Sequence, residues 1–296
     1  MIRPADKQTN PGPLPPPVAD ESLAPPDGQP WPWVQIYSSK NFQWNRYDLP
    51  IRSLPPALEG FRILHLTDVH LRQSWRAVYD ELFARIDRDP PDIILFSGDV
   101  IEHQFNHRPS LAIAERFLHG LHARLGTWVT LGNHDGDLLG PHIERFGARF
   151  INGRFAALQD DARGGATIEL LGVPGVARSD ANEGFLSQVP PRSGDSLRIA
   201  LSHFPDTLAP LATSHARPDI ILSGHTHGGQ ICLPGGVPII RHTALPARYV
   251  SGIHRFGDTW LVVSRGFGFA TWQIRLFCPA EVIELRLSRS RDRQAG

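Results

Sequence analysis

The sequence predicts an α/β protein in which two sheets pack face to face with helices outside them. From residue 61 onward, short apolar runs rich in β-branched residues alternate with longer amphipathic stretches. This βαβαβ order implies parallel strands joined by right-handed crossovers. The second half of the chain is richer in strand-like runs, with only short helical segments between them. That number of strands fits two sheets in one domain.

The elements of the first half follow from local patterns. Val78, Leu82 and Ile86 share one face of a helix that ends before Pro90, and Ser110 is the expected N-cap of a second helix. The expected strands are 61–67, 92–97 and 128–131, and the expected helices are 75–87 and 110–125. In the second half the expected strands are 148–152, 167–173, 196–202, 219–223, 259–264 and 281–286.

Composition narrows the class of protein. Thirty basic residues balance thirty acidic ones, and this zero net charge argues against a general nucleic-acid binder. Cys232 and Cys278 are too few for a disulfide framework, so we expect two reduced thiols. No apolar run approaches the ~20 residues that span a bilayer, and Arg3 is not followed by a signal-like apolar region. We therefore expect a cytoplasmic protein.

The first 33 residues differ from the rest. They hold ten of the 27 prolines and little that could form a core, so we expect a disordered, passive tail at 1–33 rather than a docking segment for a proline-binding module. The domain is expected at 34–296. Trp31, Trp33 and Trp44 could pack on the core or enter a membrane interface, and we favour the core.

Metal-ligand side chains recur directly after apolar runs. The segments are Asp68-Val69-His70, Gly98-Asp99, Gly132-Asn133-His134-Asp135, His203, and Gly224-His225-Thr226-His227-Gly228-Gly229. The carboxyl ends of strands are where α/β proteins build their sites. Each motif alone is common, but the ordered series is hard to obtain by chance. We therefore expect these segments to meet at one sheet edge.

Spacing and residue type indicate the chemistry. Residues two apart in an extended chain point the same way, so Asp68 and His70 can grip one ion, and His225 and His227 can face one site. The glycines allow tight turns close to ions and phosphate. Asp, Asn and His without Cys suit Mn, Fe, Zn or Mg rather than thiophilic ions. Four His, two Asp and one Asn are too many for one tetrahedral ion and match two ions that share a carboxylate.

These blocks, in this order, resemble the calcineurin-like metallophosphoesterases over residues 58–287. The resemblance implies a four-layer α/β/β/α sandwich of two mixed sheets, with a dinuclear site of Mn, Fe or Zn at the sheet edge. It implies that Asp99 bridges the ions and that His134 binds no metal but assists the leaving group. The implied ligands are Asp68, His70 and His227 for the first ion, and Asn133, His203 and His225 for the second. Glu102 stands where the family often has Asp, and we expect its carboxylate to orient His134.

Residues 224–234 and 266–282 look like a bacterial branch of small phosphodiesterases, some of whose members act on UDP-2,3-diacylglucosamine. The resemblance thus implies hydrolysis of a phosphodiester or pyrophosphate by a metal-bridging hydroxide, on a phosphate ester of lipid or nucleotide-sugar type. Arg72, Arg241 and His242 are candidate phosphate contacts. The alternatives are a nuclease, which the zero net charge disfavours, and a non-catalytic scaffold, which the complete ligand set disfavours. The sequence also allows peripheral contact with a lipid surface, and it does not indicate an oligomeric state.

Overall fold

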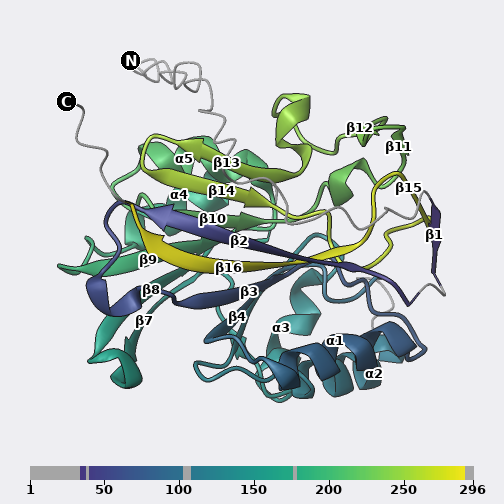
Figure 1. Ribbon diagram of the computed structural model, residues 1–296, viewed down its shortest axis with the longest axis horizontal. Helices are drawn as coiled ribbons and strands as arrows, with labels where there is room; N and C mark the ends of the chain where they lie inside the picture. Colours follow the sequence, from purple (N-terminus) through teal and green to yellow (C-terminus); the bar gives the residue numbers. More distant parts are fainter. Residues whose placement is uncertain (1–33, 38–39, 103–107, 176–178, 291–296) are drawn as a thin grey trace, which may run out of the picture.

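The computed structural model describes residues 34–37, 40–102, 108–175 and 179–290 (Figure 1). Its first half comprises β1 (Val34–Ile36), β2 (Gln43–Ile51), β3 (Arg62–Leu66), α1 (Ala77–Arg88), β4 (Ile93–Ser97), α2 (Arg108–His119), β5 (Thr127–Thr130), α3 (Gly136–Ile143) and β6 (Arg149–Phe150). The second half comprises β7 (Arg154–Asp160), β8 (Ala166–Gly172), α4 (Ser179–Gln188), β9 (Ser196–Leu201), α5 (Leu208–Thr213), β10 (Ile220–Ser223), β11 (Cys232–Leu233), β12 (Val237–Pro238), β13 (Gly252–Phe256), β14 (Thr259–Val263), β15 (Ile274–Leu276) and β16 (Glu281–Arg289).

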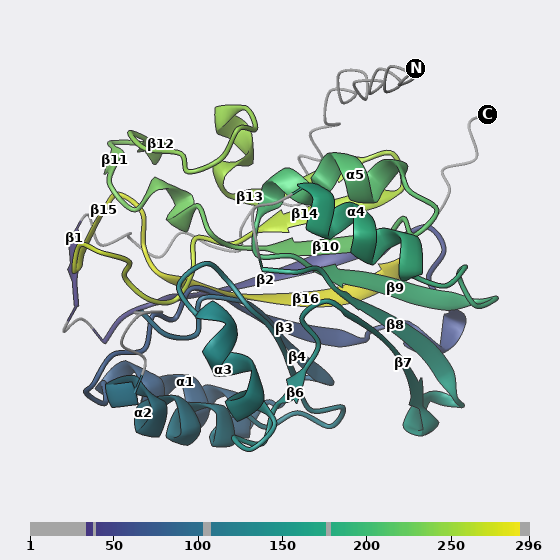
Figure 2. The same cartoon turned by 180° about the vertical axis from the view of Figure 1, so that it is seen from behind.

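Two six-stranded mixed sheets form the centre of the fold. One has the strand order β2-β16-β3-β4-β5-β6 and the other β13-β14-β10-β9-β8-β7. Parallel pairing joins β3, β4, β5 and β6 in the first sheet, and β8, β9, β10 and β14 in the second. The helices α1, α2 and α3 cover the outer face of the first sheet, and α4 and α5 cover that of the second (Figures 1 and 2). The layers are therefore α/β/β/α, as predicted.

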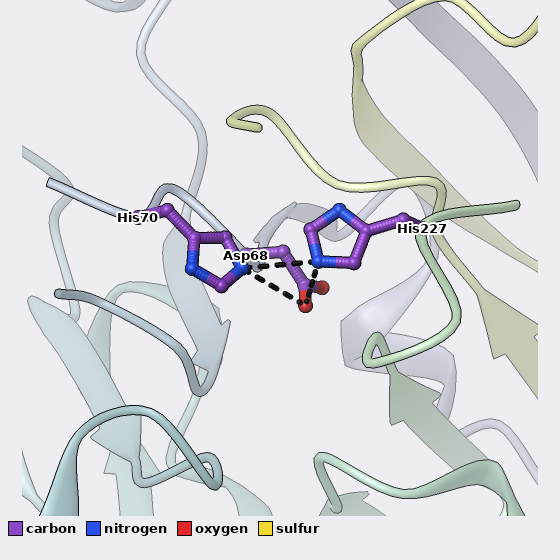
Figure 3. A group of neighbouring side chains, drawn as sticks. All are labelled: Asp68, His70 and His227. Atoms are coloured by element: carbon purple, nitrogen blue, oxygen red, sulfur yellow. Dashed lines mark hydrogen bonds and ion pairs between the residues drawn. The ribbon is translucent and has the colours of Figure 1, made fainter. Parts of the chain in front are cut away.

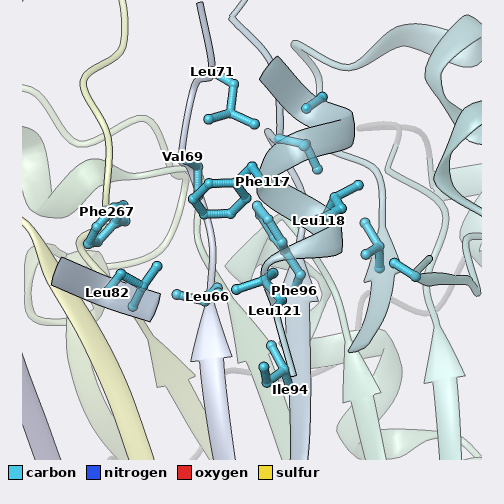
Figure 4. Packing of buried hydrophobic residues seen from close by; sticks show 14 of the residues in the cluster. Leu66, Val69, Leu71, Leu82, Ile94, Phe96, Phe117, Leu118, Leu121 and Phe267 are labelled. Atoms are coloured by element: carbon cyan, nitrogen blue, oxygen red, sulfur yellow. The ribbon is translucent and has the colours of Figure 1, made fainter. Parts of the chain in front are cut away.

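Period-two alternation explains why both faces of each sheet are apolar. In β4, Ile93 and Leu95 belong to the core between the sheets, whereas Ile94 and Phe96 belong to the core under the helices. Figure 4 shows this second core, in which Phe117 of α2 lies over the first sheet. A third cluster packs α4 and α5 on the outer face of the second sheet. Strands buried on both sides read as continuous apolar runs.

The predicted strands of both halves are present, some of them shortened at their ends. The second predicted helix needs correction. It ends at His119 instead of residue 125, because Gly120 and Leu121 close turns on preceding carbonyls, and Ser110 lies buried inside the helix rather than capping it. Trp44 packs against the core as predicted, whereas Trp31, Trp33 and the 1–33 tail lie outside the described residues.

Both cysteines are free and buried, as predicted. Within the ranges given above, no helix has the length and apolar character needed to cross a membrane. The central strands β3, β4, β5, β9 and β10 all have their carboxyl ends at the edge where the predicted motifs begin, and this arrangement positions the site.

Candidate metal centre

Backbone hydrogen bonds join the loops that follow the central strands. The amide of Asp68 donates to the carbonyl of Gly98 at 3.0 Å, and the amide of His70 donates to the carbonyl of Asp99 at 3.1 Å. In the second sheet, the amide of Gly224 donates to the carbonyl of His203 at 3.1 Å, and between the sheets the amide of Gly268 donates to the carbonyl of Asp68 at 2.7 Å. Loops that are far apart in the sequence therefore hold their side chains at one place.

A first donor cluster joins Asp68, His70 and His227 (Figure 3). The Nε2 atoms of the two histidines lie 3.0 Å apart, and Asp68 Oδ1 is 3.3 Å from His227 Nε2 and 3.9 Å from His70 Nε2. The side chains of Asp68 and His70 are fully buried, and that of His227 is nearly so. Three donor atoms thus converge on one point, as a single ion requires.

A second cluster adjoins the first through Asp99. Asp99 Oδ2 lies 3.6 Å from His70 Nε2 and 3.3 Å from His203 Nε2. His203 Nε2 also contacts Asn133 Oδ1 at 3.1 Å. The His225 ring lies further out, with its centroid 5.1 Å from that of His203, and it belongs to none of the three tight donor groups. The three donor groups are Asp68–His70–His227, His70–Asp99–His134 and Asp68–Asp99–His203. Because Asp68, His70 and Asp99 each belong to two of them, the groups form one continuous centre.

Unusual backbone conformation marks the same residues. Five of the expected ligands have positive φ angles between 49° and 69°, which are uncommon for residues other than glycine; they are Asp68, His70, Asp99, His225 and His227. Such strain persists only where the surrounding structure enforces it, and it concentrates at functional sites. No pattern in the amino-acid sequence indicates this feature.

Glycines make room for the carboxylates. A Cβ atom on Gly224 would lie 2.1 Å from Asp68 Oδ2, and one on Gly132 would lie 2.1 Å from Asp99 Oδ1. Neither glycine has a positive φ angle, so lack of space alone excludes a side chain there. The motif glycines therefore allow close approach between neighbouring loops.

Burial and charge set the protonation states. For Asp99, burial alone would raise the pKa, but the charges of His203 and His70 hold it well below its ordinary value. Burial opposes protonation of His203, yet Asp99 raises the pKa of His203 to about 9. Burial, followed by the charge of His203, lowers the pKa of His225 to about 3. Burial also lowers the pKa of His227. Burial likewise opposes protonation of His70, yet Glu102 and the two buried aspartates raise the pKa of His70. In the metal-free centre, carboxylates therefore favour the protonated rings of His70 and His203, whereas the rings of His225 and His227 are neutral.

The carboxylate of Glu102 does not orient His134, contrary to what the sequence leads us to expect. This carboxylate lies 2.7 Å from His70 Nδ1 and accepts a hydrogen bond from Arg72 at 3.1 Å, so it orients His70 and not His134. His134 is held instead by the backbone carbonyl of Glu102, 2.7 Å from its Nδ1. The longer side chain of Glu passes His134 and reaches the neighbouring loop. A carboxylate on the outer nitrogen of a histidine ligand fixes its tautomer and ring orientation.

The three candidate phosphate contacts differ in position. Arg72 is committed to Glu102 and the carbonyl of Phe269, and its side chain is 19% exposed. His242 lies at the rim, its ring centroid 6.2 Å from that of His225, and Arg241 beside it is exposed. Arg241 and His242 are therefore exposed at the surface, whereas the Arg72 guanidinium already has two hydrogen-bond acceptors.

Sequence reasoning missed Arg275. Its guanidinium is fully buried behind the first cluster, where Nη2 lies 3.3 Å from His227 Nδ1 and donates to the carbonyls of Arg265 and Gly268 at 2.7 Å each. Thr67 was also missed, and its hydroxyl donates to Asp68 Oδ2 at 2.7 Å. A lone Arg in a short strand and a Thr at a strand end carry no distinctive pattern. By contrast, His65 is a buried core residue as predicted, 2.8 Å from Ser97 Oγ.

The donor set fits divalent ions. Imidazole nitrogens and carboxylate oxygens converge within a buried pocket, and the neutral state of His225 and His227 is the one that binds metal. Nearby charges also keep Asp99 ionised. The residues present are therefore those that a divalent cation would need.

Comparison with known proteins agrees with this chemistry. A family model described as calcineurin-like phosphoesterase matches residues 61–229. The uncharacterised metallophosphoesterase YkuE of Bacillus subtilis is 29% identical over 236 residues, covering 77% of this chain and 79% of the relative. The phosphodiesterase YaeI of Escherichia coli is 27% identical over 239 residues, covering 77% and 82%. Among solved structures, the phosphopantetheinyl hydrolase of Mycobacterium tuberculosis shares 12% identity over 74% of this chain and 96% of that one, with a TM-score of 0.43.

Proposed function

Because the chain belongs to the calcineurin-like phosphoesterase family, whose members hydrolyse phosphoesters with metal ions, we propose that it cleaves a phosphodiester or pyrophosphate bond with two divalent ions. The observation that carries the proposal is the overlap of three donor groups through Asp68, His70 and Asp99. One ion would use only one group. Overlapping groups with a shared carboxylate are the arrangement that two ions need.

Each side chain then has an assigned task. Asp68, His70 and His227 would hold one ion, and Asn133, His203 and His225 the other, with Asp99 between them. Mn, Fe and Zn all suit these ligands. When bound, the ions neutralise charge on the phosphoryl oxygens and lower the pKa of the attacking water. His203 must release its proton as its ion binds, because only the neutral ring is a ligand.

His134 is the proposed general acid. Hydrogen bonding of its Nδ1 to the carbonyl of Glu102 fixes the ring and leaves Nε2 to donate a proton to the departing oxygen. Its backbone amide is also anchored, donating to Asp99 Oδ1 at 2.8 Å. The acid is thus held by the same carboxylate that is shared between the ions. Arg241 and His242 at the rim are the proposed phosphate contacts.

The decisive test separates metal binding from proton transfer. With bis(p-nitrophenyl) phosphate and Mn, His134→Ala should keep both ions and lose about 10²–10⁴-fold in turnover. His119→Ala on α2, a histidine exposed to solvent away from the centre, is the matched control and should retain wild-type turnover. Full turnover by His134→Ala at full metal content would disprove the acid role.

The shared ligand has its own test. Asp99→Asn should lose both ions together when metal content is measured after dialysis, because the substituted side chain serves both donor groups. Retention of two ions with wild-type affinity would exclude the bridging assignment. Parallel assays with p-nitrophenyl phosphate, UDP-diacylglucosamine and single-stranded DNA then identify the class of ester that is cleaved.

A further inference from the structure

The most exposed large apolar side chains of the described residues all lie at one end of the molecule. They are Val34, Ile36, Leu233, Val237, Ile239, Ile240 and Trp272, each between 40% and 59% exposed. We call these seven side chains the apolar end face. Of the elements that carry them, β1, β11, β12 and the loop before β15 gather at the same end in both views (Figures 1 and 2). Ile239 and Ile240 directly follow β12, and the amide of Ile239 donates to the carbonyl of Ile231 beside β11 at 3.3 Å.

Regular pairing holds this face outward. β1 pairs with β15, so that Val34 and Ile36 lie opposite Leu276 and Ile274 on one side of a two-stranded sheet. A bridge between Ile231 and Leu276 joins this sheet to β11, which in turn pairs with β12. The face is therefore a folded platform and not a set of loose side chains.

The side chain of Gln230 ties the loop of Trp272 to this platform. Its Nε2 donates to the carbonyl of Trp272 at 2.8 Å, and its Oε1 accepts from the amide of Ala270 at 3.1 Å. A polar residue that is almost completely buried thus anchors the backbone of Trp272, whose side chain is more than half exposed.

The chain segments that form the face are poor in acidic residues. Asp258 is the only acidic residue between Asp219 and Glu281, and residues 34–47 contain none. Arg241, directly after Ile240, is exposed. Two carboxylates have recorded contacts beside the face, and both are already engaged. Asp206 accepts from the hydroxyl of Thr243 and the amide of Ala244, and Glu102 accepts from Arg72 and the amide of Thr271. A partner for this surface should therefore be apolar and anionic.

We propose that the apolar end face docks on an anionic phospholipid surface. Aliphatic side chains would enter the boundary between headgroups and acyl chains, the Trp272 indole would lie at headgroup level, and Arg241 would meet lipid phosphates. Protein interfaces are enriched in aromatic residues, Met and Arg, and their energetic centres are poor in Leu and Val, whereas six of these seven side chains are Val, Ile or Leu.

Docking would also place the metal centre beside the lipid. β11 begins three residues after Gly229 of the last motif, and the rings of His242 and His225 lie 6.2 Å apart. That docking would bring a lipid phosphate ester to the metal centre as substrate rests on the proposed function, whereas the docking itself does not.

Vesicle sedimentation tests the proposal on the full chain, once with Mn and once with chelator. Binding should be stronger to mixed phosphatidylglycerol–phosphatidylcholine vesicles than to pure phosphatidylcholine vesicles. The double variant Ile239→Ser/Trp272→Ser should lower the partition coefficient roughly tenfold or more, because two half-exposed apolar side chains no longer leave water. Its turnover of a soluble ester and its thermal unfolding should match the wild type, since both side chains lie at the surface.

A second pair of variants tests the charge. Arg241→Glu should lower binding to the anionic vesicles about fivefold or more. Arg154→Glu changes net charge equally but lies on β7, an edge strand of the second sheet, and should bind as the wild type does.

Three results would overturn the proposal. The first is no sedimentation with anionic vesicles. The second is binding that chelator abolishes, which would mean that the ions capture headgroups. The third is self-association that the double variant removes, which would assign the face to a second copy of the chain. These outcomes are separate from failure of the proposed hydrolysis, because vesicle binding is measured without catalysis.

Discussion

Glu102 offers the sharpest test of how the centre is built. Its Oε2 lies 2.7 Å from His70 Nδ1, and its Oε1 accepts from the guanidinium of Arg72 and the amide of Thr271, both at 3.1 Å. The two oxygens therefore serve three donors. In Glu102→Gln, only one of the two terminal atoms can accept.

Either orientation of the new amide disturbs the centre. If its oxygen faces Arg72 and Thr271, its NH₂ group meets His70 Nδ1 and forces the ring proton onto Nε2, the atom that faces the ion. If its oxygen faces His70, two other donors lose their acceptor. Loss of such an outer partner usually weakens metal affinity 10–100-fold, which corresponds to about 1.4–2.8 kcal/mol.

Titration of metal-free protein with Mn, followed by calorimetry, measures this loss directly. Glu169→Gln is the matched control, because Glu169 is an equally buried carboxylate that lies 2.6 Å from Arg198 Nε and takes no part in the donor groups. The control should lose stability but not metal affinity. Wild-type affinity in Glu102→Gln, or an equal loss in Glu169→Gln, would refute the reasoning.

Three further outcomes are expected. Gly224→Ala should abolish metal binding in elemental analysis, because the new Cβ meets Asp68 Oδ2, whereas Gly184→Ala, with open space around it, should not. Burial lowers the pKa of His65 to about 3, so between pH 6.5 and pH 3 only the unfolded chain gains that proton, and the free energy of unfolding falls by about 1.4 kcal/mol for each unit that the pH is lowered. In urea unfolding of the metal-free proteins, the free energy of unfolding of His65→Gln should therefore fall by about 2 kcal/mol less between pH 7 and pH 5 than that of the wild type. Chelation should lower the Tm, since an ion present at a hundredfold excess over its Kd contributes about 2.7 kcal/mol.

The strands that the sequence did not predict show where pattern reasoning fails. β2, β7 and β13 are the longest of them, and each is an edge strand of its sheet. The central strands β4, β5, β9, β10 and β14 are buried at every position, so they read as apolar runs. The edge strands mix buried, half-buried and exposed positions, and their sequences look like loops. Pairing with a neighbour, which the local sequence does not encode, makes them strands.

The residues of the candidate site also fall into a group that the sequence predicts and a group that it does not. Residues that sit directly after an apolar strand, such as Asp68 and His203, could be predicted because chain order and strand direction place them at one edge. Arg275 could not be predicted, and Glu102 was predicted with the wrong histidine as its partner, because each contacts a histidine that is remote in sequence or on another loop. Their partners depend on how the loops fold over the sheet edge.

The strained backbone at Asp68, His70, Asp99, His225 and His227 connects these two findings. A positive φ angle turns each side chain away from the direction that an extended strand would give it, so a two-residue spacing alone does not bring Asp68 and His70 onto one ion. The hydrogen bonds that close the loops enforce the turn, and the motif glycines give it space. The ligands therefore depend on their supporting residues for direction as well as position. Substitutions among the glycines and at Glu102 should consequently impair metal binding while leaving every ligand in the sequence unchanged.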